Sequence, residues 1–185
     1  MMVSLQSRYG FDMAPAELDD YVRREEDVVI AKLQEKLVAC PGVDEVLARL
    51  AASGEYKLAV VSSSALRRVQ ASIDKVGQAG YFGADVYSAA TSLPTPTSKP
   101  DPAIYLFAME KLGKSAAECI AVEDSKSGTL SGTRAGLKVI GYVGPYKEEE
   151  REHMEQVLRE AGAVVIMQDW SEFDECLAKI ERGEV

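Results

Sequence analysis

Three separate groups of polar residues have the types and positions needed to bind an anion or a metal ion. The first group is Ser62-Ser63-Ser64, which follows the apolar run Leu-Ala-Val-Val and precedes a predicted helix. Serine hydroxyls and backbone N–H groups at a strand-to-helix turn can bind an anion. Serine is also a preferred N-cap residue, so capping of the following helix is the alternative role for this group.

The second group is centred on Lys99, in the sequence Ser-Lys-Pro-Asp-Pro. Asp101 is a predicted N-cap and Pro102 a predicted first helical residue, because proline is favoured at that position. Lys99 therefore lies immediately before a helix, where its ammonium group could neutralise a phosphate as a point charge. The alternative is an ordinary solvated lysine on the surface.

The third group is the adjacent pair Glu123-Asp124, which ends the apolar run Ile-Ala-Val and precedes Ser-Lys-Ser-Gly. Carboxylates at the end of a buried strand are costly unless they meet a cation or hydrogen-bond donors. Magnesium takes oxygen ligands, so a divalent ion would suit this pair. The alternative is that Asp124 caps the helix that follows.

Short apolar strands that alternate with helices must position these three groups. The pattern predicts strands at 58–61, 85–88, 119–122, 137–142 and 164–167, and helices at 43–52, 65–76, 102–112, 128–135, 146–161 and 172–180. This alternation indicates a parallel sheet with helices on both faces. Ligands of such sheets bind beyond the carboxyl ends of the strands, so we expect the polar groups to converge there.

The amino-terminal part of the chain has a different pattern. Residues 1–39 contain a long, charged, amphipathic helical run. Cys40-Pro41-Gly42 breaks this pattern. We therefore expect two parts, a helical segment at 1–39 and an α/β core at 40–185.

Taken together, the three groups resemble motifs of the haloacid dehalogenase superfamily. The segments LAVVSSS, SKPDPAIY and VEDSKSGTLSGTRAGLKVIGYV are similar to its second, third and fourth motifs. The resemblance runs from about Pro41 to Val143, and more weakly through Trp170. Residues 1–39 resemble the second part of the helical cap of the β-phosphoglucomutase-like branch. The resemblance implies a Rossmann-like, three-layer parallel sheet with a partial helical cap at the N-terminus.

The resemblance also implies a role for each group. Ser62, with Ser63, would hold the transferring phosphoryl group, and Lys99 would balance its charge. Asp124, helped by Glu123, would hold Mg²⁺. The implied activity is that of a magnesium-dependent phosphatase or phosphomutase that acts on a small phosphorylated metabolite through an aspartyl-phosphate. Phosphoryl transfer depends mainly on positioning and charge neutralisation, which these residue types supply.

The first motif of that family, an Asp nucleophile two residues before a second Asp, is missing. No D-x-D occurs in the sequence, and Asp12, Asp19 and Asp20 follow no apolar strand. In the resembled fold the first strand lies between the strands predicted at 58–61 and 119–122. We therefore expect a chain that lacks this strand and is inactive as given, and an upstream segment that carries it.

Two further interpretations remain open. The chain could be a non-catalytic protein that binds a phosphorylated ligand or regulates another process without phosphoryl transfer. It could also be an α/β domain in which the polar strand ends are only helix caps. Restored turnover on supplying an upstream D-x-D strand would favour the enzyme, whereas a complete lack of phosphate binding would favour the third interpretation.

Composition excludes several other classes of function. The chain has 21 Lys+Arg against 30 Asp+Glu, a net charge of −9 and a sequence pI of about 4.8, which argues against general nucleic-acid binding. Its three cysteines are far apart, which predicts a reducing, cytoplasmic location without disulfides or a zinc site. The single histidine, His153, lies in a charged helical run and is not expected to serve a catalytic triad. No apolar run is long enough for a membrane span, and oligomeric state is left open.

Overall fold

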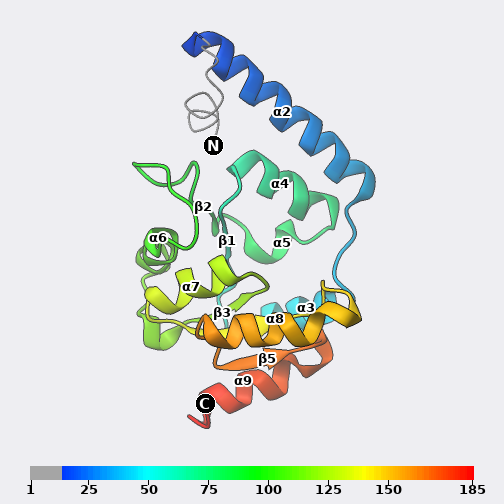
Figure 1. Cartoon of the computed structure of the whole chain (residues 1–185). Helices are drawn as coiled ribbons and strands as arrows, with labels where there is room; N and C mark the ends of the chain where they lie inside the picture. The colour runs from blue at the N-terminus through cyan, green and yellow to red at the C-terminus, as the bar shows by residue number, and fades with distance from the viewer. Residues whose placement is uncertain (1–13) are drawn as a thin grey trace.

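The computed structural model describes residues 14–185 and has five strands, all of which pair in parallel (Figure 1). They form a two-stranded sheet, β1-β2, and a three-stranded sheet, β3-β4-β5. The strands are β1 (Val60–Ser62), β2 (Val86–Ser88), β3 (Ile120–Glu123), β4 (Lys138–Tyr142) and β5 (Val165–Met167). Each overlaps a predicted strand, which confirms the α/β class.

Helices connect the strands at nearly the predicted positions. They are α2 (Pro15–Lys36), α3 (Val43–Ser53), α4 (Leu66–Lys75), α5 (Ala79–Phe82), α6 (Ala103–Leu112), α7 (Lys126–Arg134), α8 (Glu148–Glu160) and α9 (Phe173–Glu181), with 3-10 turns at Ala116–Glu118 and Trp170–Glu172. Helix α5 and the 3-10 turns were not predicted, because they are too short to show a helical period in the sequence. Asp101 accepts a hydrogen bond from the Ala103 amide at 2.9 Å, but the N-cap of α6 is Pro102 and its first helical residue is Ala103, each one residue later than predicted.

Helices cover both faces of the strands and produce three layers. On one face α6 packs on Tyr87 of β2 and on Ala121 and Val139 of the other sheet. On the opposite face α3 and α9 pack on β4 and β5, and α4 packs on β2. Helix α6 therefore contributes to a core that both sheets share, and it fixes their relative position.

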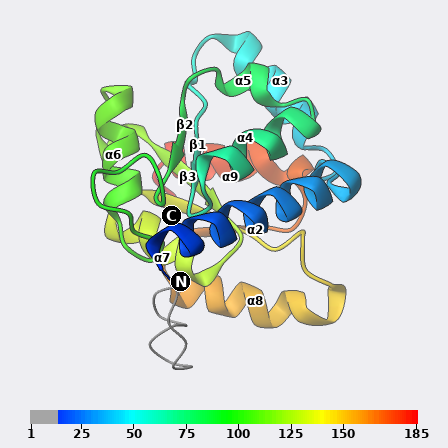
Figure 2. The same cartoon turned by 90° about the horizontal axis from the view of Figure 1, so that it is seen from above.

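Helix α2 is attached to the rest of the molecule mainly by charged groups. None of its residues is buried, and it lies along α4 (Figures 1 and 2). Arg67 of α4 pairs with Glu26 at 2.7 Å and with Asp27 at 2.9 Å, and Arg68 pairs with Glu25. The charged run of α2 is therefore an ionic contact surface. Whether 1–39 and 40–185 behave as separate domains stays a prediction.

The two sheets are not joined by a strand within residues 14–185. Strand β1 pairs with β2 and β3 pairs with β4, but β1 and β3 do not pair with each other. The resemblance predicted a missing strand between these two strands. The space between them is a groove lined by residues that include 57–61 and 119–122.

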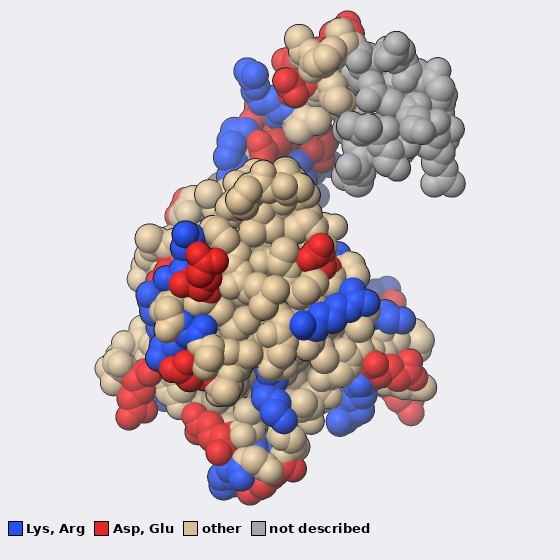
Figure 3. All heavy atoms as spheres, turned by 90° about the vertical axis from the view of Figure 1, so that its left-hand side faces the viewer, with Lys and Arg blue, Asp and Glu red and all other residues tan. Residues whose placement is uncertain are grey.

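The surface and the cysteines add two general observations. The face in Figure 3 has a broad uncharged area, with lysine, arginine and acidic side chains interspersed around it. Among the described residues, no helix combines the length and the apolar character that crossing a bilayer requires. All three cysteines, Cys40, Cys119 and Cys176, are free thiols.

Candidate active site

The centre of the candidate site is a buried ion pair between Lys99 and Glu123. The Lys99 ammonium contacts a Glu123 carboxylate oxygen, and it donates a hydrogen bond of 2.8 Å to the Val61 carbonyl. The two charged side chains are only 9% and 7% exposed. Val61 belongs to β1 and Glu123 ends β3, so Lys99 links the carboxyl ends of the two sheets.

The serine group lies beside this pair. The Lys99 backbone amide donates to Ser63 Oγ at 3.0 Å, which ties the Lys99 loop to the turn after β1. Ser62 Oγ accepts from the Ser64 amide at 3.1 Å. The structure therefore brings the first and second sequence groups into direct contact.

The capping alternative for the serines does not agree with the structure. The N-cap of α4 is Ala65, which makes no side-chain capping bond. The Leu66 amide at the start of α4 donates instead to Thr91 Oγ1 at 3.1 Å. The serine hydroxyls are therefore not used to cap α4.

A tyrosine and a glycine hold the Glu123 carboxylate in place. Tyr105 of α6 donates its hydroxyl to the same Glu123 oxygen that pairs with Lys99. Burial, followed by the charge of Glu123, raises the pKa of Tyr105 well above its usual range, so this phenol remains a donor. A Cβ at Gly128 would lie 1.7 Å from the other Glu123 oxygen, so only glycine fits there without a shift of Glu123.

Asp124, the other member of the acidic pair, faces solvent. Its backbone carbonyl accepts a hydrogen bond from the Tyr146 hydroxyl at 2.9 Å. The cap of α7 is Ser125, whose Oγ accepts from the Gly128 amide at 3.0 Å. Asp124 therefore does not cap this helix, and no bond of its carboxylate occurs among residues 14–185.

The donor set fits a magnesium ion with few protein ligands. Within residues 14–185, no three His, Cys, Asp or Glu side chains converge as a complete metal cage. Mg²⁺ commonly binds one or two carboxylates and takes its other ligands from water and substrate phosphate. The exposed Asp124 carboxylate meets this requirement, whereas Glu123 is already engaged by Lys99 and Tyr105.

Tyr105 and Gly128 were not identified from the sequence as site residues. Tyr105 lies one turn inside the helix after Lys99, which would place it near the site only if α6 packs against β3. Gly128 lies five residues after Glu123, and its small size is explained only by the folded position of that carboxylate. Neither relation could be derived without the tertiary packing.

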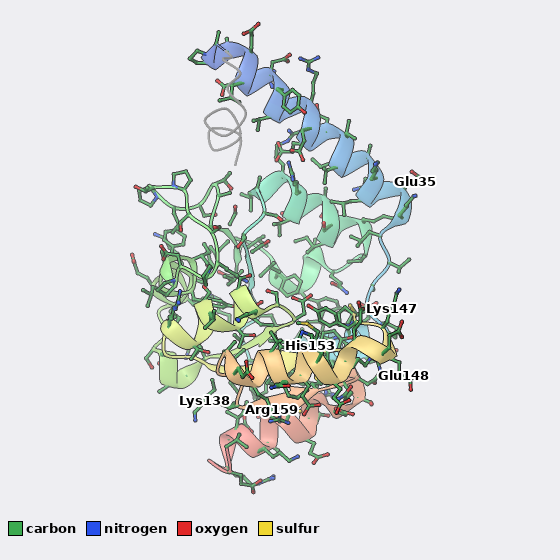
Figure 4. All side chains as sticks on the ribbon, in the orientation of Figure 1. Glu35, Lys138, Lys147, Glu148, His153 and Arg159 are labelled. Carbon is green, nitrogen blue, oxygen red and sulfur yellow. The ribbon has the colours of Figure 1, made fainter. Side chains whose placement is uncertain are left out.

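The remaining acidic residues near the amino terminus and the single histidine lie away from this site or outside the described residues. Asp12 lies outside residues 14–185, and Asp19 and Asp20 are exposed on α2. His153 is exposed on α8, a helix rich in charged residues (Figure 4). Glu148 and Arg159 belong to the same helix, and Lys147 is its N-cap. The histidine is therefore a surface residue, as predicted.

Comparison with known proteins agrees with this architecture. YhcW of Bacillus subtilis (strain 168) is 34% identical over 136 residues, which is 74% of this chain and 58% of that protein. The phosphorylated carbohydrates phosphatase of Thermotoga maritima is 28% identical over 151 residues, 81% of this chain and 65% of that protein. The chain thus spans less than two thirds of each of these relatives.

A solved structure shows the same fold. CbbY from Rhodobacter sphaeroides, crystallised in complex with xylulose-(1,5)bisphosphate, superposes with a TM-score of 0.69 and 27% identity. The match covers 87% of this chain and 68% of that one. Residues 5–142, well over half of the sequence, match the family of haloacid dehalogenase-like hydrolases. This chain belongs to the haloacid dehalogenase-like hydrolase family.

Proposed function

We propose that this chain carries the phosphoryl-binding and metal-binding parts of a magnesium-dependent phosphatase or phosphomutase that acts on a small phosphorylated metabolite. One observation carries the proposal. The buried Lys99 ammonium pairs with Glu123 at the carboxyl ends of two strands, the Lys99 backbone amide donates to Ser63 Oγ, and the exposed Asp124 directly follows Glu123. This combination offers positive charge, a hydrogen-bond donor and a metal ligand at one edge.

Lys99 and Ser62 are the residues proposed to bind the phosphoryl group, with Ser63 beside them. An ammonium group has three donors. Two of those of Lys99 are used by Val61 and Glu123, which leaves one for a phosphoryl oxygen. Glu123 fixes the position of the ammonium, and Tyr105 fixes Glu123. We therefore treat Glu123 and Tyr105 as positioning residues.

Asp124 is the proposed ligand of Mg²⁺, and Glu123 supports the site through its charge. Bound magnesium would neutralise charge on the transferred phosphoryl oxygens. Asp124 is suited to this role because its carboxylate faces solvent and is not used as a helix cap.

The substrate class rests on the relatives. One is a phosphorylated carbohydrates phosphatase, and another holds xylulose-(1,5)bisphosphate in its crystal structure. A small sugar phosphate is therefore the proposed substrate.

The location and the partners are proposed from composition. The free cysteines support a reducing, cytoplasmic location, and the net charge of −9 supports the absence of a nucleic-acid partner.

The proposed reaction passes through an aspartyl-phosphate, and no D-x-D motif is present to provide its nucleophile. We therefore expect the 185-residue chain to bind phosphate and magnesium but to hydrolyse no sugar phosphate. The missing motif is also the observation that favours the alternative function, a non-catalytic phosphoryl-ligand-binding or regulatory protein. A fusion that supplies an upstream strand with D-x-D distinguishes the two, because only the enzyme would gain phosphatase activity.

The test of the site is the binding of inorganic phosphate in the presence of MgCl₂, measured by isothermal titration calorimetry. Ser62→Ala should weaken phosphate binding, and Asp124→Asn should remove its dependence on magnesium. Asp174→Asn is the matched control, because Asp174 pairs with Arg49 on the surface of another region. Undetectable binding by the folded wild-type chain, or equal binding by all three variants, would contradict the proposal.

A further inference from the structure

The backbone of Asp124 is held from three directions, although its carboxylate faces solvent. Glu123, the residue before it, ends β3 and is paired with β4. Ser125, the residue after it, caps α7. The third contact comes from another segment, because the Tyr146 hydroxyl donates a hydrogen bond of 2.9 Å to the Asp124 carbonyl. Tyr146 therefore fixes the main chain of Asp124 from a position 22 residues away in the sequence.

The loop that carries Tyr146 joins β4 to α8 and is itself held firmly. The Tyr146 amide donates to the Val143 carbonyl at 3.1 Å, which closes a turn. The Tyr146 side chain packs against a buried cluster that includes Val143 and Leu158. A Cβ at Gly144 would overlap the hydroxyl and ring of Tyr142, so only glycine allows the loop to approach this ring so closely. The Tyr146 hydroxyl is therefore a donor in a fixed position.

Arg151, near the start of α8, adds a further restraint on this loop. Its Nε donates to the Tyr146 carbonyl at 3.1 Å, and its Nη2 donates to the Gly144 carbonyl at 3.3 Å. A guanidinium presents its donors in a rigid planar arrangement, so this double contact fixes the loop in a way that a lysine could not. A series of contacts thus runs from α8 through Arg151 and Tyr146 to Asp124.

The position of Asp124 matters because it has to be correct for a metal ion. Mg²⁺ requires near-ideal octahedral geometry and is usually held by only one or two carboxylates. Groups that orient a metal ligand without touching the metal typically change metal affinity by about tenfold or more. Since the Asp124 carboxylate faces solvent, its position depends on its backbone, to which Tyr146 donates.

We propose that Tyr146 is a positioning residue for Asp124 and that Arg151 acts through Tyr146. The inference rests on the proposed function, because it takes Asp124 as the magnesium ligand. Tyr146 is not among the residues proposed to bind the phosphoryl group, which are Lys99 and Ser62 with Ser63. Loss of the Tyr146 hydroxyl should therefore weaken metal binding and leave metal-free phosphate binding unchanged.

The test measures binding of Mn²⁺ to the whole 185-residue chain by electron paramagnetic resonance of the free ion. Mn²⁺ prefers the same oxygen ligands as Mg²⁺. We expect Tyr146→Phe to bind Mn²⁺ about tenfold more weakly than the wild type. Calorimetric titration with inorganic phosphate in the absence of metal should give the same affinity for both proteins.

Tyr56→Phe is the matched control for this change. It also removes a hydroxyl hydrogen bond of 2.9 Å, which Tyr56 donates to Glu181 of α9. This variant should bind Mn²⁺ like the wild type. Equal Mn²⁺ binding by Tyr146→Phe and Tyr56→Phe would overturn the proposal. A parallel loss of metal-free phosphate binding by Tyr146→Phe would show a general structural effect and would also overturn it.

Asp124→Asn separates failure of this inference from failure of the proposed function. If Asp124→Asn loses Mn²⁺ binding while Tyr146→Phe keeps it, Asp124 remains the metal ligand and only the role of Tyr146 is wrong. If Asp124→Asn binds Mn²⁺ as well as the wild type does, or the folded wild type binds none, the proposed metal site is wrong and the inference fails with it.

Arg151→Ala tests the contact from α8. Loss of a positive charge favours cation binding electrostatically, so weaker Mn²⁺ binding would have to come from the loop. We expect binding at least about threefold weaker in the wild-type background and no further loss in the Tyr146→Phe background, because residues that act through one another are not additive. Arg159→Ala removes the same charge from the same helix, where Arg159 pairs with Glu155 at 2.8 Å, and should bind like the wild type (Figure 4). Additive losses, or unchanged binding by Arg151→Ala, would overturn the role assigned to Arg151.

Discussion

The two sheets of this protein differ in how fully their strands are paired and covered. Strand β4 pairs with a neighbour on each side, and its Val139 and Ile140 are 0% exposed. Strand β1 pairs on one side only, and its Val60 and Val61 are half-buried and line the groove. The central strand of the three-stranded sheet therefore has a partner on both sides, whereas β1 leaves one edge of the two-stranded sheet without a strand partner within residues 14–185.

This difference shows where the molecule can carry a site. The candidate active site lies where the complete sheet meets the incomplete one, and it is held there by Lys99, Glu123 and Tyr105. Buried charges at such a junction need an oppositely charged or hydrogen-bonding partner, because burial removes their hydration. The same groups therefore join the sheets and shape the site.

Breaking the junction should have the largest effect. Glu123→Ala leaves the Lys99 ammonium buried without its carboxylate, so we expect a loss of about 3–5 kcal/mol in the free energy of unfolding. Urea denaturation measures this value. Glu175→Ala, which breaks the exposed pair of Glu175 with Lys179, is the control and should cost less than about 1 kcal/mol. Similar small losses for both variants would contradict the description of the junction as a buried pair.

The same truncation in the two sheets compares them directly. Val139→Ala on β4 should cost about 2–3 kcal/mol, because it leaves a cavity in a closed core. Val61→Ala on β1 should cost about 1 kcal/mol, because this side chain already borders the open groove. Thermal and urea denaturation give both values. A larger loss for Val61 than for Val139 would reverse the comparison.

The phenol of Tyr105 tests the junction through pH. Tyr105→Phe removes the hydrogen bond to a charged Glu123, with an expected loss of about 1.5–3 kcal/mol. The folded state raises the pKa of Tyr105 above the ordinary value of 10.0, so its stabilising effect is present below that pH and is lost as the pH rises above it.

Denaturation at neutral and at alkaline pH therefore shows how much of the stability contributed by the Tyr105 hydroxyl depends on its protonation. The difference in stability between wild type and Tyr105→Phe should shrink above pH 10.0. A difference that stays constant across this range would show that Tyr105 ionises as easily in the folded chain as in the unfolded one.

The smallest effect is expected where α2 meets α4. Arg67→Ala removes two ion pairs whose arginine side chain is 58% exposed, so we expect a loss below about 1 kcal/mol and faster hydrogen exchange in α2. About 1 M NaCl should loosen α2 of the wild type in the same way, because salt screens exposed charges. Arg49→Ala, which breaks a pair with Asp174 on other elements, should leave exchange in α2 unchanged.

Much of the fold could be predicted from the sequence because its elements carry strong local signals. The apolar run of β4 and the amphipathic pattern of α3 gave the correct element types, and their bounds differ from prediction by one residue. The turn after β1 was identified from the three serines at 62–64, of which Ser62 ends the strand itself. Strand boundaries were less accurate at β1, where the observed strand begins two residues later than predicted, because its outer residues have no partner to pair with.

Only some of the site residues and their roles could be predicted from the sequence. Ser62, Lys99, Glu123 and Asp124 stand out because polar residues at strand ends are costly without a partner. The sequence could not show, however, whether the serines and Asp124 bind a ligand or cap the helices that follow them. That distinction depends on which hydroxyl reaches which amide, and the structure assigns the cap of α7 to Ser125 and leaves α4 without a serine cap.

The sequence by itself determined the alternation of strands and helices, the family resemblance and the absence of a D-x-D motif, because each of these is a local pattern. Only the tertiary structure decided that Glu123 faces inward while Asp124 faces solvent, that Tyr105 and Gly128 hold Glu123, and that an apolar groove separates β1 from β3. These features depend on contacts between residues far apart in the chain, and such contacts exist only after the helices have packed on both faces of the strands.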